Sequence, residues 1–343
     1  AAAQGVAAEV NVGAAPSAND ISMSMVQLRI SSAICVPLML GATVAAFLYL
    51  DSRGTAVNMV RPGASAFCVA LGKMASLALA NLKRLEMERR EALMRAELDA
   101  AAAAQKWIMP KRVGRFGPFS TIGESRPGQY VGGDFFDIIP LDENRVAVAV
   151  GDVCGKGIGA SVLMTATQGF LHAALQESAD PGVAVALANR YVNPRRPESK
   201  FVTLWVGVFD SRDGTLKYVD AGHSFALLHR GADGTVEQLS RGGGLPIGVE
   251  ASAPYHAEVV NIAQGDKVMI VSDGIIEQPA GLVENPEGMT LSRVRPRFEL
   301  DGVGRSLARA GSDEVADLFK EVVRHAGTEQ LSDDATAVMV KWI

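Results

Sequence analysis

Residues 145–157 read RVAVAVGDVCGKG, an apolar run that ends in Asp152 and passes into glycine. An unbroken apolar run of this length, bounded by turn residues, is typical of a strand buried on both faces. The design recurs at residues 267–274, KVMIVSDG, and at residues 332–343, SDDATAVMVKWI. A fourth version, VGGDFFD at residues 131–137, places an acid directly after two glycines. Acids beside apolar strands therefore recur four times in this part of the chain.

Strands also dominate the segments between these motifs. Residues 201–209 and 215–219 flank Asp213-Gly214, a dipeptide typical of β-hairpins, and Asp233-Gly234 predicts a second turn. Helices are predicted over residues 161–176 and 312–326, and loops with a short helix over residues 281–310. Hairpins between neighbouring strands favour antiparallel sheets covered by helices over a doubly wound parallel fold. The predicted fold class is therefore α+β.

The acids at the strand ends form the candidate site. If the strands are neighbours, Asp134, Asp152, Asp273 and the pair Asp333–Asp334 converge at one rim of the core. Carboxylates so close together cannot all stay ionised without a cation, and hard oxygen ligands select Mg²⁺ or Mn²⁺. The alternative is that each acid is a turn residue, because Asp-Gly at a strand end is commonly a turn. Four such motifs in one domain favour the metal site.

The ordered motifs VGGDFFD, GDVCGKG, VSDGIIE and DDATAV resemble the PPM/PP2C-type phosphatases, and most closely their bacterial branch related to stage II sporulation protein E and RsbU. The segments FVTLWVGVFD, LKYVDAGHSFALLHR, GGGLPIGV and AQKWIMP resemble the same branch. The resemblance covers about residues 103–343. It implies an α-β-β-α sandwich with two metal ions at one end.

The resemblance also implies which residues hold the ions. The implied ligands are Asp134, Asp152, the carbonyl of Val153, Asp273, Asp333 and Asp334, and the implied catalytic set is Asp134, Asp152, Asp273 and Asp333. By motif position, Asp152 would bridge both ions, while Asp273 and Asp333 would complete the second ion's shell. Asp134 would bind directly or through water, and Asp137 would support the shell.

The activity implied by this resemblance is hydrolysis of phosphoserine or phosphothreonine in a protein. Two Mn²⁺ or Mg²⁺ ions would lower the pKa of a bridging water, which attacks phosphorus without a covalent phosphoenzyme. In this branch the substrate is usually a phosphorylated anti-sigma-factor antagonist or a similar regulator. The alternative is an inactive module that binds a phosphoprotein or scaffolds partners, against which the retained acids argue.

Several residues allow two interpretations. Eukaryotic relatives hold phosphate with an arginine near the N-terminus, but none of Arg112, Arg115 and Arg126 can be assigned to that role. Lys156 is either an exposed turn charge or a phosphate contact, and the turn is favoured. For Cys154, packing is favoured over a nucleophilic role. For His223, a structural role is favoured over metal or substrate binding.

The N-terminal part contains a nearly uncharged stretch, residues 32–50. Two buried strands turning near Gly41 are favoured over a membrane span, because Pro37 suits a helix poorly. This stretch and the helical pattern after it resemble the late part of a GAF domain, although an unrelated small α+β dimerisation domain is the alternative. We predict three parts: a partial GAF-like sensory or dimerisation domain over residues 1–67, a connector helix over residues 68–110 and a phosphatase domain over residues 111–343. A connector that forms a homodimer is favoured over a helix that folds back on its own domain.

Composition limits the remaining classes. The chain has 343 residues and a net charge of −5 without a dense basic run, so nucleic acid is not an expected partner. The cysteines Cys35, Cys68 and Cys154 are far apart and fit a reducing cytoplasm rather than a disulfide framework. No basic segment precedes the apolar stretch, so neither a signal peptide nor a membrane partner is expected. Because the sequence begins with Ala, we expect a fragment or a trimmed chain.

Overall fold

A computed structural model describes residues 6–11, 27–53, 63–128, 131–241, 243–281, 295–309, 311 and 313–343. The chain divides into two units, residues 1–96 and 97–343, which are described separately. Parts of the segment predicted to be GAF-like, namely residues 1–5, 12–26 and 54–62, lie outside the described residues. So do residues 282–294, within the predicted loop region.

The first unit contains a three-stranded antiparallel sheet in the order β1-β2-β3. Its strands are β1 (Ala8–Asn11), β2 (Ile30–Leu40) and β3 (Thr43–Arg53). Gly41, with φ at 62°, makes the turn between β2 and β3, so two strands turning there are confirmed and a membrane helix over residues 32–50 is not formed. The expectation that both strands are buried is wrong, because β3 is mostly exposed in the described chain. Strand β2 buries Ile34 and Val36 against Cys68 of the helix that follows, and from β3 Leu48 packs against this cluster.

Helix α2 (Ala64–Ile108) is continuous over 45 residues. In the first unit, Cys68 packs against Ile34 and Val36 of β2, and the hydroxyl of Ser76 accepts the backbone N–H of Met39 at 2.9 Å. By length and composition alone, α2 and the later helix α3 (Ile158–Ser178) could each cross a membrane. Helix α3 instead contributes to the core of the second unit.

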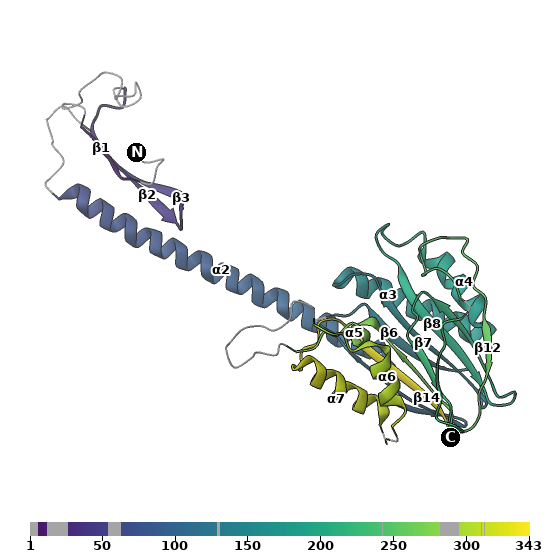
Figure 1. Cartoon of the computed structure of the whole chain (residues 1–343). Helices are drawn as coiled ribbons and strands as arrows, with labels where there is room; N and C mark the ends of the chain where they lie inside the picture. Colours follow the sequence, from purple (N-terminus) through teal and green to yellow (C-terminus); the bar gives the residue numbers. More distant parts are fainter. Residues whose placement is uncertain are drawn as a thin grey trace, which may run out of the picture. The chain divides into compact units, whose positions relative to one another are not determined.

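The second unit consists of two antiparallel sheets with helices on their outer faces (Figure 1). The six-stranded sheet has the order β11-β10-β13-β14-β5-β4, and the five-stranded sheet has the order β12-β9-β8-β7-β6. The strands of the first are β4 (Val113–Phe116), β5 (Phe119–Arg126), β10 (Ala226–His229), β11 (Val236–Gln238), β13 (Lys267–Val271) and β14 (Ala335–Trp342). Those of the second are β6 (Asp134–Pro140), β7 (Arg145–Val153), β8 (Val202–Asp210), β9 (Thr215–Ala221) and β12 (Glu258–Asn261).

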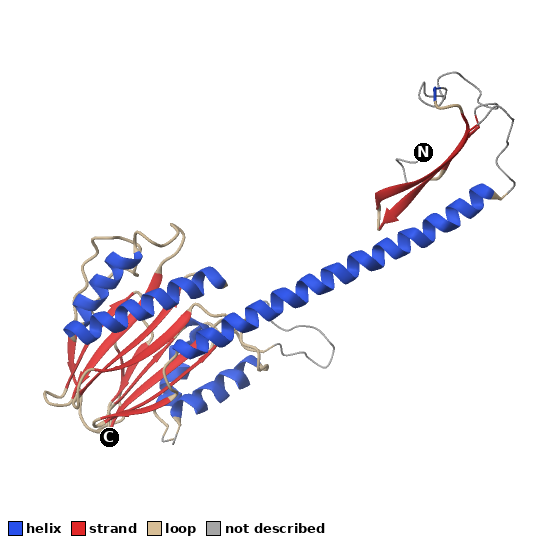
Figure 2. Cartoon of the chain, turned by 180° about the vertical axis from the view of Figure 1, so that it is seen from behind, coloured by secondary structure: helices blue, strands red, loops and turns tan. Residues whose placement is uncertain are grey.

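Three apolar clusters separate the four layers. One lies between the sheets around Trp205, another between the five-stranded sheet and helices α3 and α4 (Pro181–Val192), and the third under α6 (Glu299–Leu307) and α7 (Glu314–Ala326). Figure 2 shows the stacked sheets between their helices. In β7 successive residues contribute alternately to the first and second clusters, as strand geometry requires. The predicted α-β-β-α sandwich is confirmed.

Local signals explain where the helices begin and end. Helix α4 begins with Pro181 after Asp180, whose carboxylate accepts the N–H of Val183. Helix α7 begins after Asp313, which accepts the N–H of Ala316, and ends at Gly327 with φ at 67°. The helices predicted over residues 161–176 and 312–326 are therefore present, although residue 312 lies outside the described chain.

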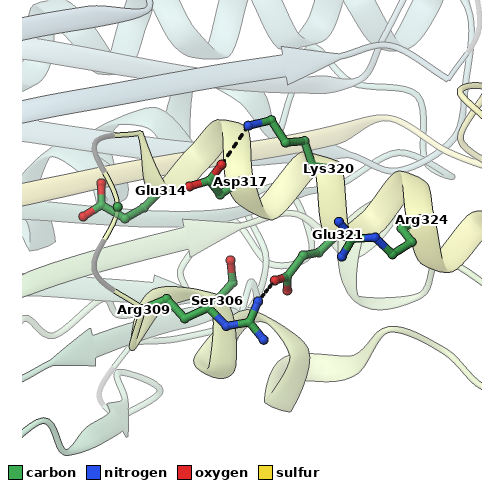
Figure 3. Close-up of a pocket in the computed structure, with 8 residues that line it drawn as sticks. Ser306, Arg309, Glu314, Asp317, Lys320, Glu321 and Arg324 are labelled. Atoms are coloured by element: carbon green, nitrogen blue, oxygen red, sulfur yellow. Dashed lines mark hydrogen bonds and ion pairs between the residues drawn. The ribbon is translucent and has the colours of Figure 1, made fainter.

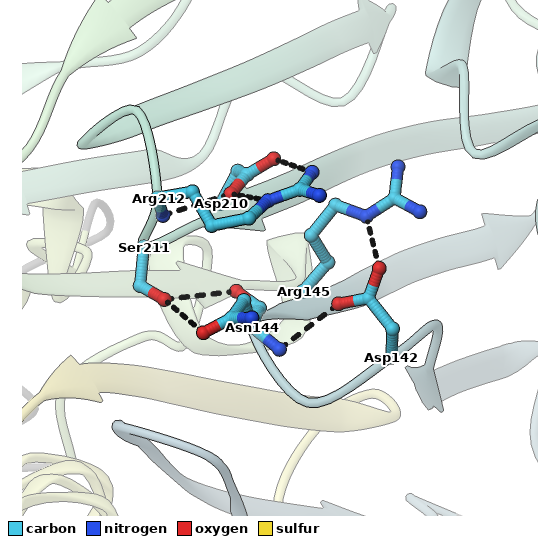
Figure 4. A network of polar contacts seen from close by, with 6 residues as sticks. All are labelled: Asp142, Asn144, Arg145, Asp210, Ser211 and Arg212. Atoms are coloured by element: carbon cyan, nitrogen blue, oxygen red, sulfur yellow. Dashed lines mark hydrogen bonds and ion pairs between the residues drawn. The ribbon is translucent and has the colours of Figure 1, made fainter.

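Turns close one end of the five-stranded sheet (Figure 4). The β6–β7 turn carries an ion pair between Arg145 and Asp142 at 2.7 Å, and the β8–β9 turn carries one between Arg212 and Asp210 at 2.6 Å. Ser211 donates its N–H to the carbonyl of Asn144 at 3.1 Å and so joins the two turns. These charges pair with each other, and Asp134 and Asp152 lie at the opposite end of β6 and β7.

Candidate active site

Strand register brings two of the predicted acids side by side. Asp134 begins β6 and lies opposite Asp152, near the end of the antiparallel neighbour β7. The six-stranded sheet contributes the others, because β13 leads through Ser272 into α5 (Asp273–Ile276), and Asp333–Asp334 directly precede the paired strand β14. Each sheet therefore carries acids at the ends of two neighbouring strands.

Asp134 is 2% exposed, and neither of its carboxylate oxygens has a hydrogen-bond partner among the described residues. The hydroxyls of Ser272 and Thr336 lie close enough to lower the pKa of Asp134, but their hydrogen bonds of accepted geometry run to the carbonyl of Asp334 and to the hydroxyl of Ser125. Burial, followed by the charge of Asp152, raises the pKa of Asp134 well above its ordinary value. A buried carboxyl without a donor is the kind of group that a bound cation would satisfy.

The acids of the two sheets act on one another. Burial and then the charge of Asp273 raise the pKa of Asp152 to about 7. Burial and then the charge of Asp333 raise the pKa of Asp273. The structure thus brings the predicted acids within electrostatic reach of each other, although no three His, Cys, Asp or Glu side chains of the described chain already form a metal-binding group.

Glycines allow the strands to approach at this edge. A β-carbon on Gly133 would lie 2.8 Å from the carbonyl oxygen of Val153 and 3.2 Å from Oδ1 of Asp152. A β-carbon on Gly274 would collide with the carbonyl oxygen of Asp334. The glycines beside the acids therefore leave room for the Val153 carbonyl and the Asp152 carboxyl to face the same space. Carboxylate and carbonyl oxygens together fit Mg²⁺ or Mn²⁺.

Asp334 braces the turn before β6. Its Oδ1 accepts the N–H of Gly128 at 2.9 Å, and its Oδ2 accepts the N–H of Gly133 at 2.6 Å. Each oxygen keeps a further lone pair, so these bonds leave the predicted ligand role possible. The contacts link the start of β14 to the start of β6, which belong to different sheets.

Gln105 near the end of α2 holds the same turn from the other side. Its side-chain amide donates to the carbonyl of Gly132 at 3.0 Å and accepts the N–H of Gly132 at 3.2 Å. Both bonds are buried, so the amide matches the two polar groups of one residue. The segment AQKWIMP pointed to this region, but the sequence did not identify Gly132 as the partner.

Lys156 forms an ion pair with one predicted ligand. Its Nζ lies 2.7 Å from Oδ1 of Asp333, and its side chain is 46% exposed. The reading of Lys156 as only an exposed turn charge therefore overlooked a direct contact with the acids.

Asp137 does not support this cluster, contrary to the prediction. Asp137 lies on the opposite face of β6 from Asp134, the face toward α3. Its Oδ2 is 2.7 Å from Nδ1 of His172 in that helix. Its Oδ1 accepts the N–H of Ile138. The motif VGGDFFD holds two acids three residues apart, and strand geometry directs them to opposite faces.

His223 has the surroundings of a structural residue. Burial lowers its pKa to about 4, so the ring is neutral near pH 7, and its Nε2 is 2.9 Å from the carbonyl oxygen of Val271. Cys154 contributes its carbonyl to the Nζ of Lys200, at 2.7 Å. The role of Lys200 was missed by the sequence analysis, because no local pattern marks it.

A polar hollow of about 230 Å³ lies apart from the aspartates, between α6 and α7 (Figure 3). Arg309 forms an ion pair with Glu321 of α7, and Lys320 forms one with Asp317 along the same helix. The paired charges leave this hollow without the unsatisfied groups that mark the edge with the aspartates.

The family model described as "Stage II sporulation protein E (SpoIIE)" matches residues 142–343, which is more than half of the chain. The chain belongs to the SpoIIE family. The matched range includes Asp152, Asp273 and Asp333, and it does not reach the segment predicted to be GAF-like. The predicted resemblance to the PP2C-type, SpoIIE/RsbU-like phosphatases is confirmed for this part.

Individual relatives of this SpoIIE-family chain support the same assignment. Stage II sporulation protein E of Bacillus subtilis is 27% identical over 219 residues, which cover 63% of this chain and 24% of that protein. Phosphoserine phosphatase RsbU of the same organism is 21% identical over 250 residues, covering 72% of this chain and 70% of RsbU. The chain therefore spans about a quarter of the first relative's length and most of the second's.

Solved structures show the same fold. The SiaA PP2C domain of Pseudomonas aeruginosa aligns with a TM-score of 0.61 at 17% identity, covering 74% of this chain and 99% of that domain. The phosphatase domain of Bacillus subtilis SpoIIE with a fragment of its regulatory domain aligns with a TM-score of 0.53 at 24% identity, covering 67% of this chain and 63% of that structure. The second unit has the fold of the PP2C phosphatase domains.

Proposed function

We propose that this chain hydrolyses phosphoserine or phosphothreonine in a phosphorylated regulatory protein, with two Mn²⁺ or Mg²⁺ ions at the edge where the aspartates meet. The ions would be held by Asp134, Asp152, the carbonyl of Val153, Asp273, Asp333 and Asp334. The observation that carries the proposal is Asp134, a buried carboxyl without a hydrogen-bond partner in the described chain, beside a second carboxyl of raised pKa.

The donor set fits divalent cations better than it fits protons alone. A carboxyl whose pKa is raised well above its ordinary value is poorly solvated in its charged form, and nearby carboxylates make this worse. The nearby hydroxyls of Ser272 and Thr336 offset this only in part, since their hydrogen bonds of accepted geometry run to other acceptors. A bound pair of divalent cations would supply positive charge and a water of lowered pKa.

The chain's own residues would prepare the site for this chemistry. Asp152 and Asp134 fix oxygen ligands on neighbouring strands, so their separation is set by backbone register rather than by loops. Asp334 holds the turn that carries Gly133, which leaves room for the Val153 carbonyl. In the reaction, a water oxygen bonds to phosphorus, the ester P–O bond breaks, and the seryl or threonyl oxygen takes up a proton.

The substrate and assembly are proposed by analogy. RsbU is named a phosphoserine phosphatase, and the corresponding substrate here would be an anti-sigma-factor antagonist or a similar signalling protein. The first unit would serve as a partial GAF-like sensory domain, and α2 would join two copies in the cytoplasm. These roles rest on the sequence patterns described above.

The test is hydrolysis of p-nitrophenyl phosphate and of a phosphoserine peptide by the full chain in Mn²⁺. We expect turnover that EDTA removes and that Asp152→Asn reduces by at least about a hundredfold, since it removes a carboxylate that would hold the metal ions. Asp142→Asn, at the opposite end of the sheet, should retain wild-type rates. Turnover that persists in EDTA, or in Asp152→Asn, would refute the metal-dependent mechanism.

A further inference from the structure

Lys156 lies in the turn that connects β7 to α3, between two glycines whose φ angles are 83° and 88°. We propose that the Lys156 ammonium binds the phosphoryl group of the substrate, an inference that rests on the proposed phosphatase function. The turn places a cation directly beside the proposed metal ligands. As an exposed turn charge alone, Lys156 would have no role in substrate recognition.

The position of the ammonium is defined by its contacts. Its Nζ lies 2.7 Å from Oδ1 of Asp333 and 3.4 Å from the carbonyl oxygen of Ser332. A lysine side chain is protonated at neutral pH, and the charges of Asp333, Asp334 and Asp273 act on this ammonium. The ammonium is therefore charged at neutral pH and close to acids from the ends of both β13 and β14.

The ion pair leaves Lys156 free to exchange partners. Its side chain is 46% exposed and that of Asp333 is 45% exposed, and a pair this accessible to water is held weakly. Lysine has a flexible stem and acts as a point charge, so the ammonium can leave Asp333 for a phosphoryl oxygen nearby. Phosphoryl transfer benefits from positive charge on these oxygens as the transition state forms.

Two of the arginines considered for phosphate binding form ion pairs with acids outside the proposed metal site. Arg112 pairs with Glu124 at 2.9 Å and with Asp313 at 2.7 Å. Arg126 pairs with Glu124 at 2.7 Å, and its guanidinium lies 4.2 Å from the ring centre of Phe319 in α7. Both side chains thus contact the outer helical layer.

The third arginine lies at the wrong end of its sheet. Arg115 pairs with Ser120 in the β4–β5 register, and Ser120 pairs with Lys341 near the end of β14. The predicted ligands precede the start of β14, at its other end. Strand register therefore separates Arg115 from the aspartates.

Lys200 supports the turn rather than competing for the substrate. Its Nζ donates to the carbonyl of Cys154 at 2.7 Å, and it occupies the space that a side chain on Gly155 would need. This contact fixes the backbone two residues before Lys156. The ammonium of Lys156, in contrast, contacts an acid that is itself half exposed.

The test compares Lys156→Gln, Lys156→Arg and Lys320→Gln in the full chain. Lys320 is the matched control, because it forms an ion pair with Asp317 at 2.9 Å on α7. In saturating Mn²⁺, we measure kcat and KM for p-nitrophenyl phosphate, inhibition by inorganic phosphate, and phosphate binding by calorimetry. Mn²⁺ binding is followed separately by the shift in melting temperature.

A charge-assisted hydrogen bond to phosphate implies that Lys156→Gln weakens phosphate binding and raises KM by roughly tenfold to a hundredfold. Lys156→Arg should recover most of this loss, and Lys320→Gln should match the wild type. The Mn²⁺-induced shift should persist in all three variants.

Unchanged phosphate binding in Lys156→Gln, or an altered Mn²⁺ shift with normal phosphate inhibition, would overturn the proposal and leave Lys156 as a counter-ion of Asp333. Absence of turnover in the wild type would instead contradict the proposed function. The calorimetric comparison of phosphate binding would still decide the role of Lys156.

Discussion

Replacing Asp152 with Asn should stabilise the metal-free chain while removing its phosphatase activity. Burial and the charge of Asp273 raise the pKa of Asp152 from its ordinary value of 3.8 to about 7 in the folded state. The pKa of Asp152 is higher in the folded state than in the unfolded state. Its contribution to the free energy of unfolding is therefore fully present below about pH 4 and is lost as the pH rises through 7. Asn carries no charge at any of these pH values, so it avoids the loss.

The size of the effect follows from the shift. At about 1.4 kcal/mol per pKa unit, the free energy of unfolding falls by about 4 kcal/mol at pH 8 and by about 2 kcal/mol at pH 5, relative to pH values below 4. These figures are ceilings, because Asp152 shares its shift with Asp134 and Asp273, which can take up a proton in its place. For a unit of this size, the gain at pH 8 corresponds to a rise of several degrees in melting temperature.

The assay is thermal unfolding of the full chain in EDTA between pH 5 and pH 8. Asp152→Asn should melt above the wild type, and the difference should widen toward pH 8. Mn²⁺ should raise the melting temperature of the wild type more than that of the variant. A variant that is less stable than the wild type at pH 8, or a difference that narrows with pH, would refute the assigned electrostatics.

Asp210→Asn provides a control of opposite sign. The hydrogen bond from Arg212 lowers the pKa of Asp210, which therefore stabilises the folded state above its unfolded pKa. This variant should lose stability at neutral pH and retain activity, since the residue lies at the closed end of the sheet.

Three further variants test other contacts of the domain. Gly133→Ala introduces a β-carbon 2.8 Å from a backbone carbonyl oxygen, and we expect at least a tenfold loss of Mn²⁺-dependent turnover, measured on p-nitrophenyl phosphate. Gln105→Ala leaves the N–H and C=O of Gly132 unpaired in a buried place, and we expect a loss of about 1–3 kcal/mol in denaturant unfolding together with weaker activation by Mn²⁺. His172→Ala leaves Asp137 buried without its partner, so thermal stability at pH 7 should fall while kcat stays within about threefold of the wild type.

The predictable parts of the fold are those determined by short, local sequence patterns. Each apolar strand ended in an acid or began beside one, and that pattern placed Asp152 and Asp273 at strand ends before any pairing was known. The hairpin at Asp213-Gly214 followed from turn chemistry, with Gly214 at a φ of 64°. The layer order followed from the family resemblance, and the register then brought the acids to one edge.

The contacts that were not predictable depend on which elements meet in space. The pairing of Lys156 with Asp333 joins residues far apart in sequence, and nothing near either residue specifies the other. The exposure of β3 is a similar case, because its unbroken apolar run matches that of a buried strand while α2 packs mainly against β2. The prediction for Asp137 was wrong because it relied on closeness to Asp134 in the sequence. The pleat of the strand decides which face each residue occupies.

The cost of the acidic edge is itself an argument for its use. A buried carboxyl that has no hydrogen-bond partner in the described part of the chain, next to a second carboxyl whose pKa is raised, destabilises the domain near neutral pH. Asn at either position would remove the ionisable charge and preserve the strand pairing. Retained destabilising groups are characteristic of sites kept for function. Divalent cations would offset the repulsion, so metal binding and folding of this edge should be thermodynamically linked, and the pH dependence of Mn²⁺-induced stabilisation should follow the deprotonation of Asp152.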